Sequence, residues 1–258
     1  MNTLIIGDIH LQAGIILPWI KQDVLNKHKV NRIAFIGDYF DQWGQTGNNA
    51  LYIKEMEVLS DFVTYAKSHN LQIDWLIGNH DAPYVLNQPE HYTSDDKTIR
   101  ESICNLLKDV IRPKLTCNVG KYQLSHAGIA SNHPYENIDV FTPEGYETLY
   151  QLNRADGHTL YGALGSPLWI RPNQLMYTEP YYKHQIFGHT PVKSITQLDA
   201  HFEAWNIDTF SLTSNMIPIG DGSVLLIDET DELKTIAFPN WTSGDMYINR
   251  LEYFNSTN

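Results

Sequence analysis

The sequence has few cysteines, few basic residues and no long apolar run. Cys104 and Cys117 are too few for a disulfide framework, and neither has a Cys or His partner at zinc-site spacing. The 18 Lys and Arg residues are outnumbered by 30 Asp and Glu, and the net charge of -12 argues against stable binding to nucleic acid or anionic lipid. No apolar segment has the length needed to cross a membrane.

The chain has the length and composition of a globular protein. With 258 residues, 42% of them hydrophobic, it can bury a substantial core without help from metals or disulfides. An apolar segment that begins at Leu4 leaves no room for a secretory leader, so we expect a cytoplasmic protein. No linker rich in Gly, Ser or Pro divides the sequence, which predicts one domain over residues 1–258.

Strand-like and helix-like segments alternate in the first part of the chain. The expected strands cover residues 4–6, 33–36 and 73–77. The expected helices cover residues 18–28, with Pro18 in the first turn, 49–68 and 98–109. This alternation predicts parallel βαβ units, in which the carboxyl ends of the strands meet at one edge of the sheet.

The later part of the chain contains shorter apolar segments. They cover residues 122–124, 185–187, 204–210, 223–227 and 234–237. Turn signals such as Gly220-Asp221-Gly222 separate the last of them and predict a second, mostly antiparallel sheet. Residues 130–183 are expected to form an insertion or lid over the functional site, because Pro and Gly there accompany a cluster of tyrosines. These are Tyr135, Tyr146, Tyr150, Tyr161, Tyr177, Tyr181 and Tyr182.

Five strand exits combine Gly or Ser with Asp, Asn or His. They are Gly7-Asp8-Ile9-His10, Gly37-Asp38-Tyr39-Phe40-Asp41, Gly78-Asn79-His80-Asp81, Ser125-His126-Ala127-Gly128 and Gly188-His189-Thr190-Pro191. Metals that activate water take oxygen and imidazole ligands, and a pair of ions about 3.5 to 4 Å apart needs a bridging carboxylate. A single Asp or His of this kind is usually a turn or core residue. The conjunction of five exits predicts a site for two metal ions.

The five stretches, in this order, resemble the motif series of the calcineurin-like metallophosphoesterase superfamily. The likeness extends over residues 7–189, and in style it is similar to the bacterial phosphoprotein phosphatase branch and its diadenosine polyphosphate hydrolase relatives. It implies a four-layer α/β/β/α sandwich with mixed sheets. It also implies two divalent metal ions, Mn or Fe and in some members Zn.

The resemblance assigns metal-binding roles to six residues. The first metal is bound by Asp8, His10 and Asp38. Asp38 bridges to a second metal, whose other ligands are Asn79, His126 and His189. In the mechanism expected for such a site, a hydroxide that bridges the metals attacks phosphorus in line.

Four other residues have expected roles around the phosphate. His80 is expected to be the general acid, and Asp41 is expected to accept its other N–H and raise its pKa. Arg171 is expected to grip the phosphate with its guanidinium, with Arg154 and Arg100 as alternatives. Asp81 is expected to hydrogen-bond a neighbouring loop.

Two departures from the family pattern bear on the substrate. Protein phosphatases of this branch have Asp-Arg-Gly where this chain has Asp41-Gln42-Trp43-Gly44, so a phosphate-clamping arginine is missing. Pro191 replaces the last His of the Gly-His-x-His found in many other members. We expect a phosphomonoesterase acting on a phosphorylated small molecule, nucleotide or protein. The alternatives are a diadenosine polyphosphate or other nucleotide hydrolase, a phosphodiesterase, and a metal-binding scaffold without catalysis.

Overall fold

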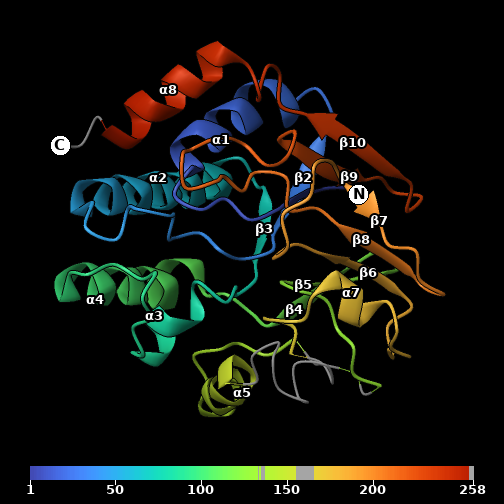
Figure 1. Ribbon diagram of the computed structural model, residues 1–258. Helices are drawn as coiled ribbons and strands as arrows, with labels where there is room; N and C mark the ends of the chain where they lie inside the picture. Colours follow the sequence, from blue (N-terminus) through green and yellow to red (C-terminus); the bar gives the residue numbers. More distant parts are fainter. Residues whose placement is uncertain (133, 135–136, 155–165, 256–258) are drawn as a thin grey trace.

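The computed structural model describes residues 1–132, 134, 137–154 and 166–255 (Figure 1). Within these residues the strands form two five-stranded sheets, each of them mixed, with helices packed on both sides. The α/β class and the mixed sheets predicted from the sequence are confirmed. None of the helices in this part of the chain has the length and apolarity needed to span a membrane.

The first sheet has the strand order β10-β9-β1-β2-β3. Its strands are β1 (Asn2–Ile6), β2 (Val30–Phe35), β3 (Gln72–Trp75), β9 (Ser223–Ile227) and β10 (Leu233–Ala237). The first three are parallel, as the alternating pattern predicts, and β9 runs antiparallel to β1. The carboxyl ends of β1, β2 and β3 therefore meet at one edge.

The second sheet has the order β4-β5-β6-β8-β7. Its strands are β4 (Thr116–Val119), β5 (Tyr122–Ser125), β6 (His184–Phe187), β7 (Thr196–Gln197) and β8 (Glu203–Asn206). The central strands β5, β6 and β8 are parallel, so the prediction of a mostly antiparallel second sheet from the last third is wrong. The reason is that β9 pairs with β1 and β10 pairs with β9, so both strands belong to the first sheet.

Alternating side chains divide the core into layers. On β1, Leu4 and Ile6 face the helices, whereas Ile5 lies in a second cluster between the sheets that also contains Ile186 of β6. Phe187, the next residue on β6, points to the outer face of the second sheet and joins a third cluster. This period of two is the sheet geometry that buries both faces of each sheet. The resulting order of layers is α/β/β/α.

The helices of the first layer lie beside β1, β2 and β3 in Figure 1. They are α1 (Ala13–Trp19), the π-helix η1 (Ile20–Val24), α2 (Asn49–Ser68), α4 (Lys97–Leu106), the π-helix η2 (Leu107–Ile111) and α8 (Gly244–Asn255). The Asn48 side chain caps α2 by accepting from the Leu51 N–H at 3.2 Å.

The first helix begins earlier than predicted. Pro18 lies inside α1 and not in its first turn. The buried Glu55 carboxylate of α2 accepts the N–H groups of Ala13 (2.8 Å) and Gly14 (3.1 Å), and it also accepts the Tyr253 hydroxyl of α8. A carboxylate at a helix N-terminus accepts hydrogen bonds from the free N–H groups and interacts favourably with the helix dipole. The cap comes from another helix, so the local sequence does not reveal it.

The segment predicted as an insertion or lid is described in part. Tyr135 and Tyr161 lie outside the described residues. The described parts contain α5 (Pro143–Arg154), which packs near α3 (Ala82–Leu86), and α7 (Pro172–Leu175). Leu175 of α7 packs on the outer face of the second sheet with Phe187.

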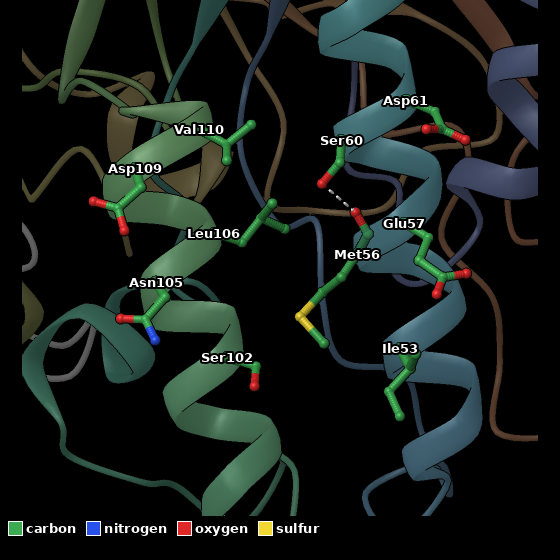
Figure 2. Close-up of a pocket in the computed structure, with 10 residues that line it drawn as sticks. All are labelled: Ile53, Met56, Glu57, Ser60, Asp61, Ser102, Asn105, Leu106, Asp109 and Val110. Atoms are coloured by element: carbon green, nitrogen blue, oxygen red, sulfur yellow. Dashed lines mark hydrogen bonds between the residues drawn. The ribbon is translucent and has the colours of Figure 1, made fainter.

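A groove of about 600 Å³ separates α2 from α4 and η2 (Figure 2). Met56 and Leu106 project into it from the facing helices, and Glu57, Asp61 and Asp109 are among the carboxylates around it. No histidine, lysine or arginine is among the described residues that line it. The groove therefore lacks the imidazole ligands and the cationic side chains of the predicted site, whose residues lie elsewhere.

Candidate metal centre

The five predicted strand exits meet at one place. His10 Nε2, from the exit of β1, lies 3.8 Å from Asp38 Oδ2 and 4.0 Å from Asp8 Oδ2. On the other side, His126 Nε2, from the exit of β5, lies 3.4 Å from the same Asp38 oxygen. Asn79 Oδ1 is 2.8 Å from both His126 Nε2 and His189 Nδ1. The structure thus brings all six predicted metal-binding residues together, with Asp38 between two groups.

Backbone carbonyls fix the proton positions on two of the imidazoles. His126 Nδ1 lies 2.9 Å from the Ile36 carbonyl, and His10 Nδ1 lies 2.9 Å from the Asp41 carbonyl. A carbonyl oxygen only accepts, so Nδ1 carries the hydrogen and Nε2 of a neutral ring presents a lone pair. The His126 lone pair then faces Asn79 Oδ1, which is another acceptor. Two acceptors at 2.8 Å repel each other unless a cation lies between or beside them, so the donor set fits a divalent metal.

Strained backbone holds several of these side chains. His10, Asp38, Asp41 and His189 have φ angles of 40°, 55°, 70° and 67°. Left-handed conformations are costly for residues other than Gly, and they persist where the surrounding structure enforces them. At Gly78 there is no room for a Cβ, which would overlap the Asp38 carboxylate and backbone. The exit of β3 therefore needs glycine because of this close approach.

Asp81 holds the loop that carries Asp38. Its buried carboxylate accepts the N–H groups of Asp38 at 2.7 Å, Tyr39 at 3.0 Å and Gly78 at 3.0 Å. This is the hydrogen bond to a neighbouring loop that the sequence predicted. The Asp38 carboxylate is held further by the His80 N–H, which donates to Asp38 Oδ1 at 2.9 Å.

Arg171 lies beside this centre. Its guanidinium donates to the His189 carbonyl at 3.2 Å and to Thr190 Oγ1 at 3.1 Å. Arg171 also lines a cleft whose other walls include His10, Asp38, Asn79, His80 and His189. Arg154 donates to Tyr150 on the exposed face of α5, and Arg100 donates to the backbone at Ser94 and Asp95. Neither alternative lines the cleft.

The family of this chain follows from a sequence comparison. The model of the calcineurin-like phosphoesterase family matches residues 1–193. The chain belongs to the calcineurin-like phosphoesterase family. Its members use divalent metal ions, and this phosphoesterase is a metal-dependent hydrolase of phosphoester bonds.

Two solved structures share the phosphoesterase fold. A cold-active protein-tyrosine phosphatase of a psychrophile, Shewanella sp., is 15% identical with a TM-score of 0.55, and the match covers 91% of this chain and 80% of that chain. A protein serine/threonine phosphatase from Saccharomyces cerevisiae is 15% identical with a TM-score of 0.56, covering 92% and 80%. Identity this low shows the fold alone. No curated protein sequence matches the phosphoesterase chain.

Burial disfavours the charged forms of the Asp and His side chains of this centre. It raises the pKa of Asp8 and Asp38 well above the usual range, with further contributions from neighbouring carboxylates. It also lowers the pKa of His10 and His126 to about 3, and that of His189 well below its usual value. Neutral imidazoles are the form that binds metal, and bound cations would favour ionised carboxylates by direct attraction.

His80 and Asp41 lie as neighbours, but the predicted pKa effect is not found. His80 Nδ1 is 3.5 Å from Asp41 Oδ2, and burial lowers the His80 pKa to about 3, helped by His91 and Arg171. Burial also raises the pKa of Asp41 to about 8, although the Tyr84 and Tyr52 hydroxyls donate to its other oxygen. Asp41 is therefore largely protonated at neutral pH and lacks the charge that would raise the His80 pKa.

Asp208 is a site residue that the sequence analysis did not single out. It is buried, lines the cleft with Arg171, and accepts the Ser211 hydroxyl at 2.7 Å, whereas its Oδ2 has no hydrogen-bond partner. Burial raises its pKa to about 7. It follows β8 as Asp8 follows β1, so the same strand-exit signal could have found it.

Proposed function

We propose that the protein is a dinuclear, metal-dependent phosphatase that hydrolyses phosphomonoesters. The observation that carries this proposal is the position of Asp38, whose carboxylate lies between His10 on one side and His126 on the other. A carboxylate can bridge two cations, which an imidazole cannot do. Both of the similar structures are phosphatases, which supports a monoester substrate.

In this proposal the two metals would share one ligand, Asp38. Asp8, His10 and Asp38 would hold the first metal, and Asp38, Asn79, His126 and His189 would hold the second. Mn or Fe is proposed, with Zn as an alternative, because oxygen and nitrogen ligands accept all three. When bound, the two cations supply positive charge to the phosphoryl oxygens and lower the pKa of water enough to provide a nucleophile at neutral pH.

The protein's own groups orient the phosphate and the leaving oxygen. Arg171 is fixed by the His189 carbonyl and Thr190, so its remaining N–H groups can bind a phosphoryl oxygen without a large loss of side-chain freedom. His80 is the proposed proton donor to the leaving oxygen. Its pKa is low in the absence of substrate, and the negative charge of a bound phosphate raises the pKa toward the range in which it donates. Asp41 is the proposed positioning residue for the His80 ring.

Metal titration tests this function. Protein stripped with a chelator is expected to be inactive toward p-nitrophenyl phosphate, and added Mn should restore activity until two ions are bound per chain. Binding should also stabilise the fold, by about 2.7 kcal/mol for each ion at a free metal concentration 100 times the Kd of its site. Activity that is complete with one ion would contradict the dinuclear proposal. Two bound ions without turnover of any monoester, nucleotide or diester would favour a scaffold.

Replacing His80 tests the proton donor. In His80→Gln, kcat for glycerol phosphate should fall by about 10²-fold or more, because an alkoxide leaves poorly without a proton. The loss for p-nitrophenyl phosphate should be below about 10-fold, because nitrophenolate leaves unprotonated. Steady-state kinetics on the metal-loaded protein gives both values. His69→Gln, at the exposed end of α2, is the matched control, and equal losses for both substrates would exclude His80 as the donor.

A further inference from the structure

The cleft above the metal centre has an aromatic and apolar wall. It has a volume of about 440 Å³, and its floor is formed by residues of the centre. Trp43, Tyr92 and Trp169 line it, together with Leu212 and Ile219. Tyr92 packs on His80 with ring centroids 4.2 Å apart, and Trp169 meets His189 edge-on at 5.7 Å. Aromatic surface thus begins directly beside the place where a phosphate would bind.

Trp43 is the most unusual part of this wall. Its side chain is 61% exposed, and Ile219 at the same cleft is 38% exposed. Trp43 lies two residues after Asp41, in a loop whose next residue, Gly44, has a φ of 75°. Exposed indole is unfavourable in water, and large exposed aromatic groups at a cleft are typical of ligand contacts. The position of Trp43 therefore indicates an apolar ligand group at the cleft mouth.

The charge of the cleft limits the number of phosphates that it can hold. Arg171 is the sole Lys or Arg among the described residues that line it. One guanidinium nitrogen, Nη1, donates to the His189 carbonyl and to Thr190, which places Arg171 beside the metal centre. The described residues of the cleft also include Trp43, Gly44 and Thr46 but no second lysine or arginine, and Asp208 adds a carboxyl group. A nucleoside polyphosphate would bring several charges to a surface that cannot neutralise them.

We propose that this cleft selects phosphomonoesters whose single phosphate is carried by an aromatic group, with the Trp43 indole stacked on that group. The proposal rests on the proposed function and specifies its substrate class. In the reaction, the oxygen of water forms a new bond to phosphorus and the bond between phosphorus and the aryl oxygen breaks. One proton of the water ends on the phenol and the other on the phosphate, so the products are a phenol and inorganic phosphate.

A pair of substrates tests the selection. For each protein, kcat/KM is measured with phenyl phosphate and with glycerol phosphate, and their ratio is compared with the wild-type ratio. This comparison cancels the intrinsic difference in reactivity between the two esters. In Trp43→Ala the ratio should fall by about 10-fold, because the aromatic group loses its stacking partner, and this factor corresponds to about 1.4 kcal/mol. Trp43→Phe should keep the ratio within about 3-fold of wild type.

A second aromatic residue provides the control. Tyr177→Ala removes a side chain that is 83% exposed and does not line the cleft, so it should leave the ratio at the wild-type value. A ratio that stays the same in Trp43→Ala would overturn the proposal while leaving the phosphatase function intact.

Binding measurements separate this proposal from the phosphatase function. Phenylphosphonate and methylphosphonate are not hydrolysed, so their affinities for the metal-loaded protein can be measured by calorimetry without turnover. Phenylphosphonate should bind more tightly than methylphosphonate. In Trp43→Ala the ratio of the two affinities should fall by about 10-fold. If neither ester is hydrolysed and this preference is present, the phosphatase proposal fails and the aromatic subsite stands. Equal affinities of the two phosphonates would overturn the subsite.

Discussion

Replacement of Asp38 by Asn is expected to abolish phosphoester hydrolysis, with kcat/KM falling by about 10³-fold or more. Asp38 Oδ2 is the atom shared by the His10 and His126 sides of the centre. An amide has nearly the same shape, but it has no negative charge and bridges two cations poorly. A pair of cations stabilises the charge of the transition state by several kcal/mol. A loss of about 4 kcal/mol of this stabilisation corresponds to a 10³-fold fall in rate.

Kinetics and metal analysis measure this effect together. The variant should hold fewer than two ions per chain at a metal concentration that saturates the wild type. Its far-UV circular dichroism should match the wild type, because Asn keeps the acceptor for the His80 N–H. Asp61→Asn, the same change on an exposed residue of α2, should retain full activity and both ions. An Asp38→Asn variant with more than a tenth of wild-type activity would refute the bridging role.

Replacement of Asp81 by Ala is expected to have the largest effect on stability, a loss of about 3 to 5 kcal/mol in the free energy of unfolding. The change removes the acceptor of three buried N–H groups, those of Asp38, Tyr39 and Gly78. Each buried donor left without a partner costs about 1 to 3 kcal/mol, and partial rehydration reduces the sum. Asp81 touches no predicted metal position, so its effect on activity acts through the placement of Asp38.

Urea unfolding of the metal-free protein measures this loss. Asp81→Asn keeps one oxygen acceptor and should lose less stability than Asp81→Ala, which separates hydrogen bonding from side-chain volume. Metal-loaded Asp81→Ala should also show weakened metal binding, because the left-handed backbone at Asp38 loses its support. A change in unfolding free energy below about 1 kcal/mol would show that these N–H groups find other partners.

The candidate site could be predicted from local sequence to a large extent. Each ligand type follows a short apolar strand, and parallel strands place their carboxyl ends at one edge whatever their sequence details. The side chains of Asp8, Asp38 and Asn79 therefore come together once the strand order is β1-β2-β3. Asp208 was given no role because the predicted strand 204–210 extends past it, whereas β8 ends at Asn206 and leaves Asp208 at a strand exit.

The remaining features depend on contacts between distant parts of the chain. The start of α1 depends on Glu55, and the sheet to which β9 belongs depends on its pairing with β1. The pKa of His80 depends on burial, which outweighs a carboxyl group 3.5 Å away that is itself buried. Neither burial nor pairing with distant segments can be read from the spacing of residues along a short stretch.

The contact between His189 and Asp8 has a consequence for the order of events during synthesis. The His189 N–H donates to the Asp8 carboxylate across 181 positions of the sequence. A ribosome therefore makes Asp8, His10 and Asp38, the proposed ligands of one ion, long before it makes His189, the last proposed ligand of the other. We expect the pair of ions to be acquired only after translation has passed this residue. The metal content of a preparation would then record the ions present when folding ended, and refolding with a different metal would be a way to exchange both.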